Sequence, residues 1–151
     1  MSYSSSRLRN GRCSQTGHAY LLTTCCHRRG RLLEHAGAAW TVLESAKWLD
    51  RERRWQLIAV VVMPDHVHLV GSLMDVPLTA LMHSFKGHTA HAINALQGRS
   101  GRVWQAGYHD RSIRSDAAFR ASIDYCLQNP VRAGLVEDFR DYPYWWCRWE
   151  V

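Results

Sequence analysis

The stretch QLIAVVVMPDHVHLVGSL, residues 56–73, contains two apolar runs separated by a Pro64-Asp65 turn. The first run, 56–63, is so rich in aliphatic and β-branched residues that it predicts a central strand. The second run, 66–73, predicts an antiparallel partner, because a tight turn joins the two. Segments with helical spacing of apolar residues lie on both sides, so this hairpin is the centre of the predicted fold.

Strands and helices alternate around the hairpin. The expected elements are a strand at 18–26, a helix from about 38 to 53, the two hairpin strands, a helix opened by Pro77, an extended segment at 103–114, and a helix from Ser115 or Asp116 that loosens near Asn129. The order β-α-β-β-α-β-α matches the split βαβ arrangement in its first six elements. We therefore expect an α+β fold, a ferredoxin-like two-layer sandwich with an antiparallel sheet, helices on one face and a C-terminal helix.

Each predicted helix carries an apolar stripe that should be buried. The stripe residues are Val42, Leu43, Ala46 and Leu49 in the first helix, Leu78, Leu81, Met82, Phe85, Ile93 and Leu96 in the second, and Phe119, Ile123 and Leu127 in the third. The aromatic tail DYPYWWCRWE, residues 141–150, should pack back on the body of the protein.

The 151 residues correspond to one domain. We expect a flexible basic arm at 1–17 and a single domain at 18–151. The five cysteines are odd in number and include no CxxC, which argues against a disulfide framework and a common zinc site. No apolar stretch could span a bilayer, and the first residues lack the apolar core of a secretory signal, so we expect a cytoplasmic protein.

The chain is basic, with a formal net charge of +6 and a pI of about 9.4. Of its 19 cationic residues only Lys47 and Lys86 are lysines. Arginine binds phosphate through two parallel hydrogen bonds and stacks on bases, which favours a nucleic-acid partner. A GC-rich genome would raise arginine usage equally well, so charge alone leaves both explanations open.

Two histidines lie in the second hairpin strand. Side chains alternate between the faces of a strand, so His66 and His68 project together. Two neutral imidazoles side by side can bind a divalent metal ion, although incidental surface or core histidines would give the same pattern. Asp65 could add a carboxylate or simply cap the turn.

A tyrosine lies off the apolar stripe of the third helix. Tyr125 and Asn129 are four residues apart and share a helix face away from Ile123 and Leu127. Taken alone, this pair is also explained by a surface tyrosine that packs its ring and keeps its hydroxyl in water.

The HVH triplet and the YxxxN spacing together resemble the HUH single-strand nucleases, and more closely the REP-associated tyrosine transposases. The resemblance covers about Gly17 to Trp146. The stretches that carry it are GHAYLLTTCCHRRGRLL, VVMPDHVHLV, FKGHTAHAIN, VWQAGYHDRSIR and YCLQNPVRAGLVEDFRDYPYWW. Their order and spacing are specific, whereas no single stretch would be.

The resemblance implies that Tyr125 is the nucleophile and that His66 and His68 bind Mg²⁺ or Mn²⁺. Asn129 occupies the position of a glutamine ligand, and Asp65 replaces the asparagine common at that turn in the family. The implied activity is cleavage and rejoining of single-stranded DNA near palindromic REP hairpins, through a 5′-phosphotyrosine intermediate. The resemblance also implies a bacterial protein associated with the nucleoid. One alternative is a non-cutting protein of the same fold that binds structured DNA or RNA, and another is a hydrolase of small phosphoesters.

Several basic residues are candidate DNA contacts because of their position in the sequence. They are Lys86, Arg111, Arg114 and Arg132 in the body, and Arg7, Arg9 and Arg12 in the N-terminal arm. Each could equally be a solvated charge. His109 and Asp110 are candidates for supporting the metal ligands. Trp104 could stack on bases but more readily packs in the core. The sequence leaves a monomer and a homodimer open.

Overall fold

The computed structural model describes residues 18–151, which form one five-stranded antiparallel sheet in the order β4-β1-β3-β2-β5. The strands are β1 Ala19–Cys25, β2 Trp55–Val62, β3 His66–Leu73, β4 His109–Ile113 and β5 Trp145–Cys147. The helices are α1 Ala36–Arg51, α2 Leu78–Gln97, α3 Asp116–Leu127 and the single turn α4 Asn129–Arg132. Short 3-10 turns are η2 His27–Arg29, η3 Leu32–Glu34 and η4 Phe139–Asp141. The predicted ferredoxin-like fold is confirmed, and β5 extends the sheet beside β2.

The hairpin occupies the middle of the sheet because β3 pairs with β1 on one side and with β2 on the other. Gly71 of β3 lies directly against β2. A Cβ at this position would be 2.6 Å from the carbonyl oxygen of Gln56 and 2.7 Å from the indole ring of Trp55. Only glycine therefore fits where the tryptophan ring crosses the strand.

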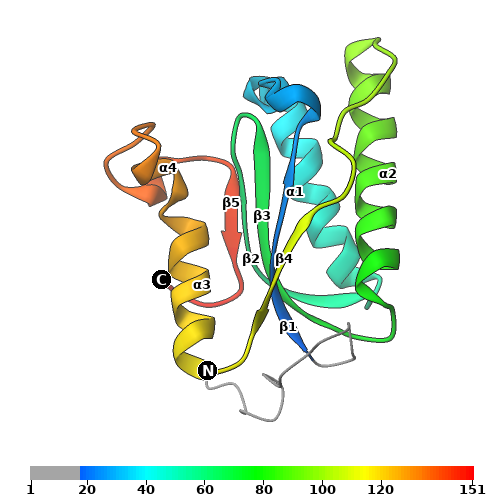
Figure 1. Ribbon diagram of the computed structural model, residues 1–151. Coiled ribbons are helices and arrows are strands. Elements are labelled where there is room, and N and C mark those ends of the chain that lie inside the picture. The colour runs from blue at the N-terminus through cyan, green and yellow to red at the C-terminus, as the bar shows by residue number, and fades with distance from the viewer. Residues whose placement is uncertain (1–17) are drawn as a thin grey trace.

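Helices cover both faces of the sheet (Figure 1). Helices α1 and α2 pack on one face, as expected, and the buried core there includes the whole predicted stripe of α1. Helix α3 and the C-terminal segment cover the opposite face. Among the described residues, no helix has both the length and the apolar character needed to cross a membrane.

One stripe residue of α2 was predicted wrongly. The side chain of Leu96 is 53% exposed. It lies in the last turn of α2, against Gly37 in the first turn of α1. Glycine has no side chain to cover Leu96 from that side, so the leucine remains half in water.

The docking of α3 positions the candidate site. Its stripe of Phe119, Ile123 and Leu127 is buried against the sheet, as predicted. The thiol of Cys126 donates a hydrogen bond to the carbonyl oxygen of His68, at 3.7 Å. Consecutive residues point about 100° apart on a helix, so a buried Cys126 leaves Tyr125 at the edge of the contact, facing β3. The C-terminal end of α3, α4 and the β2–β3 turn all lie at the same end of the sheet (Figure 1).

Candidate metal and tyrosine site

The two histidines lie on the face of the sheet that α3 covers. Their ring centroids are 4.8 Å apart, with the planes at 78°. His68 is almost fully buried, with 6% of its surface exposed. His66, at the start of β3, is partly exposed. The alternation of side chains along β3 therefore produces the paired arrangement expected from the sequence.

His68 is held by its neighbour on β1. Its Nδ1 lies 2.7 Å from the hydroxyl oxygen of Thr23, which is also its partner in the β1–β3 register. Burial lowers the pKa of His68 to about 3, and the electrostatic influence of His66, Arg132 and Arg29 acts in the same direction. The imidazole is therefore neutral at physiological pH, which is the form that binds metal ions.

His66 contacts a different group at each ring nitrogen. Its Nδ1 lies 2.7 Å from Oδ1 of Asp65, and its Nε2 lies 3.1 Å from the side-chain amide nitrogen of Asn129. Burial alone would raise the pKa of Asp65. The hydrogen bond and electrostatic interaction with His66, together with Arg29, outweigh burial and hold this pKa below its usual value. The structure thus brings Asn129 to the histidine pair.

These residues fit a divalent metal ion. The Nδ1 atoms of His66 and His68 are both engaged by other groups. The two Nε2 atoms are therefore the ones that can coordinate a metal ion. The amide of Asn129 can supply an oxygen after rotation of its two ends. Within residues 18–151, no three His, Cys, Asp or Glu side chains gather around a common point. The protein ligands would be two imidazoles and an amide, with room for the water or phosphate oxygens that Mg²⁺ and Mn²⁺ favour.

Tyr125 projects from α3 beside the histidines. Its ring centroid is 5.5 Å from that of His68, and the side chain is 48% exposed. The guanidinium of Arg132 lies over the ring, 4.2 Å from its centroid, and also donates a hydrogen bond to the backbone oxygen of Tyr125 at 2.5 Å. The tyrosine is thus held at the site while its hydroxyl remains accessible.

A cleft of about 340 Å³ opens beside the tyrosine. Its lining residues are Leu21, Thr23, His68, His109, Asp110, Arg111 and Tyr125. The β1–β4 register pairs His109 with Thr23 and Arg111 with Leu21, so these two β4 side chains share the face of the histidines. Asp110 lies between them in the strand, and alternation directs its side chain to the other face. Both predicted supporting residues thus border the cleft, but only His109 directs its side chain to the face of the histidine pair.

The remaining predicted DNA contacts are dispersed. Lys86 donates hydrogen bonds to the backbone oxygens of Gln105 and Gly107, at 2.6 and 2.5 Å, and burial lowers its pKa. It therefore ties α2 to the segment before β4. Arg114 is exposed immediately after β4. The arm residues Arg7, Arg9 and Arg12 lie outside the described part of the chain. Trp104 is buried, as expected, and donates a hydrogen bond to Thr89.

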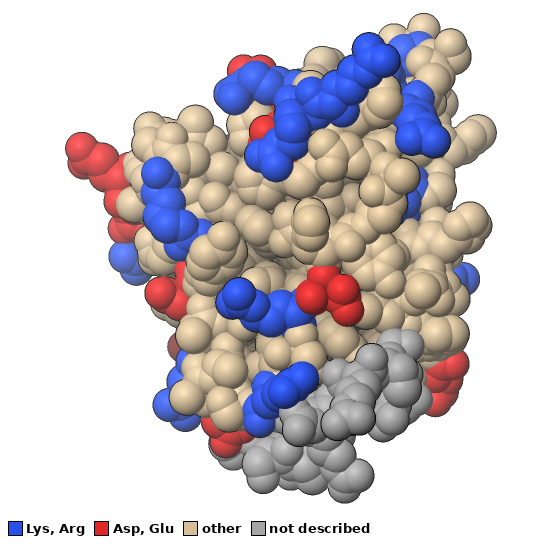
Figure 2. All heavy atoms as spheres, in the orientation of Figure 1, with Lys and Arg blue, Asp and Glu red and all other residues tan. Residues whose placement is uncertain are grey.

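Two features of the site were missed by sequence reasoning. Thr23 was not identified, although its position opposite His68 follows once the register is known. Arg29 was not identified either, yet it forms an ion pair with Asp65 at 3.1 Å. Lys and Arg side chains gather along the upper edge of the molecule (Figure 2). Exposed arginines of the loop after β1 and of the segment after α2 are Arg28, Arg29, Arg31 and Arg102.

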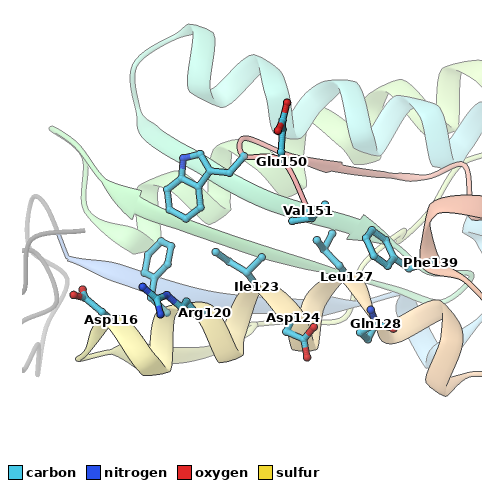
Figure 3. A pocket seen from close by; sticks show the side chains of 11 residues that line it. Asp116, Arg120, Ile123, Asp124, Leu127, Gln128, Phe139, Glu150 and Val151 are labelled. Atoms are coloured by element: carbon cyan, nitrogen blue, oxygen red, sulfur yellow. The ribbon is translucent and has the colours of Figure 1, made fainter. Parts of the chain in front are cut away.

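A second hollow, of about 390 Å³, lies between α3 and the C-terminal segment (Figure 3). Ile123, Leu127 and Phe139 line it, with Asp124 and Gln128 at its rim. Ile123 and Leu127 lie on the side of α3 roughly opposite Tyr125, given 3.6 residues per turn. The hollow is larger than the cleft beside Tyr125, but neither the two histidines nor Tyr125 or Asn129 line it, so the candidate chemistry lies in the smaller cleft.

The sequence of this chain matches those of known proteins. The family model described as "Transposase IS200 like" matches residues 14–126, a range that includes both histidines and the tyrosine. The chain belongs to the IS200-like transposase family. Asn129 lies just beyond the matched range. The predicted resemblance to REP-associated tyrosine transposases is also confirmed, by proteins that carry this name.

Two curated relatives bear that name. The protein from Escherichia coli K12 is 28% identical over 98 residues, which cover 64% of this chain and 56% of the relative. The protein from Haemophilus influenzae is 27% identical over 101 residues, covering 60% of this chain and 57% of the relative. The matched part thus spans little more than half the length of each relative.

Solved structures show the same fold. A REP-associated tyrosine transposase bound to a REP hairpin superposes with a TM-score of 0.75 at 24% identity, covering 91% of this chain and 81% of that one. A structure described as a transposase from Deinococcus radiodurans superposes with a TM-score of 0.55 at 21% identity, covering 80% of this chain and 96% of that one. Both likenesses concern the fold.

Proposed function

We propose that this family member cleaves and rejoins single-stranded DNA beside palindromic hairpins, with Tyr125 as nucleophile. The observation that supports this most strongly is the placement of Tyr125, 5.5 Å from His68 between ring centroids, on the face that also holds His66 and Asn129. A binding protein would need no such set of residues. The names of the relatives, which include a structure with a REP hairpin, support the same partner.

Residues His66, His68 and Asn129 would hold Mg²⁺ or Mn²⁺ through the two Nε2 atoms and the amide oxygen. When bound, the ion supplies Lewis-acid polarisation of the scissile phosphate and offsets the charge of the transition state. Thr23 and Asp65 orient the two imidazoles through their Nδ1 atoms. The protein thus supplies ligands whose positions are set before the substrate arrives.

Cleavage is a transesterification. The Tyr125 hydroxyl oxygen forms a bond to phosphorus as its proton is lost, and the bond from phosphorus to the 3′ oxygen of the preceding nucleotide breaks. The leaving oxygen takes a proton and becomes a free 3′-OH, while the 5′-phosphate remains on the tyrosine. Attack by a 3′-OH of another end reverses the step, so strands are rejoined without ATP. Arg132, stacked on the phenol ring, favours the developing phenolate and holds the ring in place.

The single strand would enter through the cleft beside Tyr125. Arg111 lines this cleft, Arg114 is exposed just after β4, and Arg132 is exposed above the tyrosine. All three can contact phosphates and thereby position the scissile bond. Lys86 we assign to bracing the segment before β4, because both of its nearby acceptors are backbone oxygens.

A covalent adduct is the direct test. The protein is incubated with Mn²⁺ and labelled single-stranded DNA carrying the palindromes that flank its gene, and then run on a denaturing gel. We expect a shifted band that is lost in Tyr125→Phe and His66→Ala. The matched controls are Tyr108→Phe and His88→Ala, which alter residues outside the site and should leave the band unchanged.

Other outcomes would point elsewhere. Hairpin binding without any adduct in the native protein would support the non-cutting alternative. Hydrolysis of a small phosphodiester such as bis(p-nitrophenyl) phosphate, unaffected by Tyr125→Phe, would support the hydrolase.

A further inference from the structure

We propose that Arg29 and Asp65 form a positioning pair that fixes the tautomer of His66 and directs its Nε2 toward Asn129. The inference rests on the proposed function, because the atom so presented is the one expected to bind the metal ion. It also settles a question left open by the sequence, namely whether the carboxylate at position 65 is a ligand or a turn cap. In this arrangement the carboxylate of Asp65 is neither a metal ligand nor a turn cap. It holds the imidazole of His66, which is the ligand.

The carboxylate of Asp65 uses one oxygen for each partner. Oδ1 lies 2.7 Å from Nδ1 of His66. Oδ2 accepts from Nε of Arg29 at 3.1 Å and lies 3.1 Å from its Nη2. Arg29 and His66 thus engage the two oxygens of the carboxylate separately, and together they hold its orientation. Asp65 therefore cannot turn away from His66 without breaking its contact with Arg29.

The backbone is built to deliver Arg29 to this position. Arg28 and Arg29 both have φ of 55°, in the left-handed region that costs a non-glycine residue about 1 kcal/mol or more. Hydrogen bonds hold the loop there: Arg29 N–H donates to Cys26 O at 2.9 Å, and Cys26 N–H donates to Asp65 O at 2.8 Å. The loop and the β2–β3 turn are thus joined through backbone as well as side chains.

The chemistry of the contact determines where the proton of His66 lies. An ionised carboxylate only accepts hydrogen bonds, so Nδ1 must carry the proton and Nε2 keeps its lone pair. The amide nitrogen of Asn129 donates to that lone pair at 3.1 Å. Asp65 contacts the nitrogen that faces away from Nε2, so it cannot also bind an ion held there.

The second histidine provides a comparison. His68 contacts the hydroxyl of Thr23 at Nδ1, and a hydroxyl can either donate or accept. The tautomer of His68 is therefore not imposed by a charge. An amide in place of Asp65 would have the same ambiguity, because its nitrogen end donates. Asp65→Asn is accordingly the sharpest variant, since it keeps the shape of the side chain and removes the charge.

The test has two readouts. Long-range ¹H–¹⁵N NMR of the metal-free protein reports the tautomer of His66, and titration calorimetry gives the Kd of Mn²⁺. We expect the native protein to show a single Nδ1–H form. Asp65→Asn and Arg29→Gln should give a mixture of tautomers, and Asp65→Asn should bind Mn²⁺ about tenfold more weakly. The matched control is Arg31→Gln, in the same loop, whose partner is Glu34 and which should match the native protein.

An unchanged His66 tautomer and an unchanged Mn²⁺ affinity in both variants would overturn the positioning role. That result leaves the proposed function standing if the native protein still forms the Tyr125 adduct. Conversely, the native protein could form no adduct while the variants show the expected shift of the His66 tautomer. That result refutes the proposed function and supports the positioning role. Thermal unfolding of Asp65→Asn, which is isosteric, shows that the comparison is made on folded protein.

Discussion

Replacing His68 by asparagine should weaken the fall in stability of the metal-free protein below pH 7. Burial lowers the pKa of this imidazole to about 3, from its ordinary value of 6.5. The titratable, charged or hydrogen-bonding groups around its ring are His66 of β3, Thr23 of β1, Tyr125 of α3, Arg132 of α4 and Arg29 of η2. The folded state therefore resists protonation that the unfolded chain accepts.

The magnitude follows from linkage. Because the folded pKa is depressed, the stabilisation is complete above pH 6.5 and is lost as the pH falls toward 3. Between pH 7 and pH 5 the loss assigned to this one residue is about 2 kcal/mol. A folded pKa of about 4 would give nearly the same figure, because over this range the unfolded chain takes up almost all of the proton.

Urea unfolding in EDTA at pH 7, 6 and 5 measures this loss. The native protein and His68→Asn are compared by the difference of their slopes against pH, so that the other histidines cancel. His88→Asn, at an exposed position on α2, is the matched control and should follow the native curve. Equal slopes for the native protein and His68→Asn would refute the reasoning, because they would mean that the buried ring does not resist protonation.

Three further substitutions test separate parts of the structure. Arg132→Lys should slow adduct formation on the order of tenfold with little change in hairpin binding, because lysine keeps the charge but loses the planar contact with Tyr125; quenched-flow gels measure the rate. Gly71→Ala should lower the free energy of unfolding by about 1–3 kcal/mol, measured in urea, because the new Cβ meets β2 at under 3 Å. Lys86→Met should lower it by about 1–2 kcal/mol through loss of two bonds to backbone oxygens, whereas Lys47→Met should change it little.

Much of the fold was predictable because its signals are local. The strand at 66–73 was predicted with the bounds observed for β3, and the stripe of α1 is buried throughout. The alternation of side chains in β3 was enough to place His66 and His68 on one face. The off-stripe position of Tyr125 was enough to predict its exposure. Each of these inferences depends on a repeat of 2 or 3.6 residues, which the sequence displays directly.

Other features depend on contacts between distant segments. The exposure of Leu96 depends on a glycine of another helix, and β5 pairs with β2 although its three residues have no alternation of their own. The contact between Arg29 and Asp65 requires a left-handed backbone that no residue type in the loop predicts. No local pattern carries this information.

The sequence by itself determined the order of elements and the shared face of the two histidines. It also predicted Tyr125 and Asn129 one turn apart on the third helix, whereas in the structure α3 ends at Leu127 and Asn129 begins α4. The tertiary structure decided that α3 packs on the face of the sheet opposite α1 and α2, which brings Asn129 to His66 across 63 residues of chain. The physical reason for this division is that sequence periodicity indicates only which side chains of one helix or strand share a surface. Which helix surface packs on which face of the sheet depends on burying the apolar surfaces of all elements together in one fold.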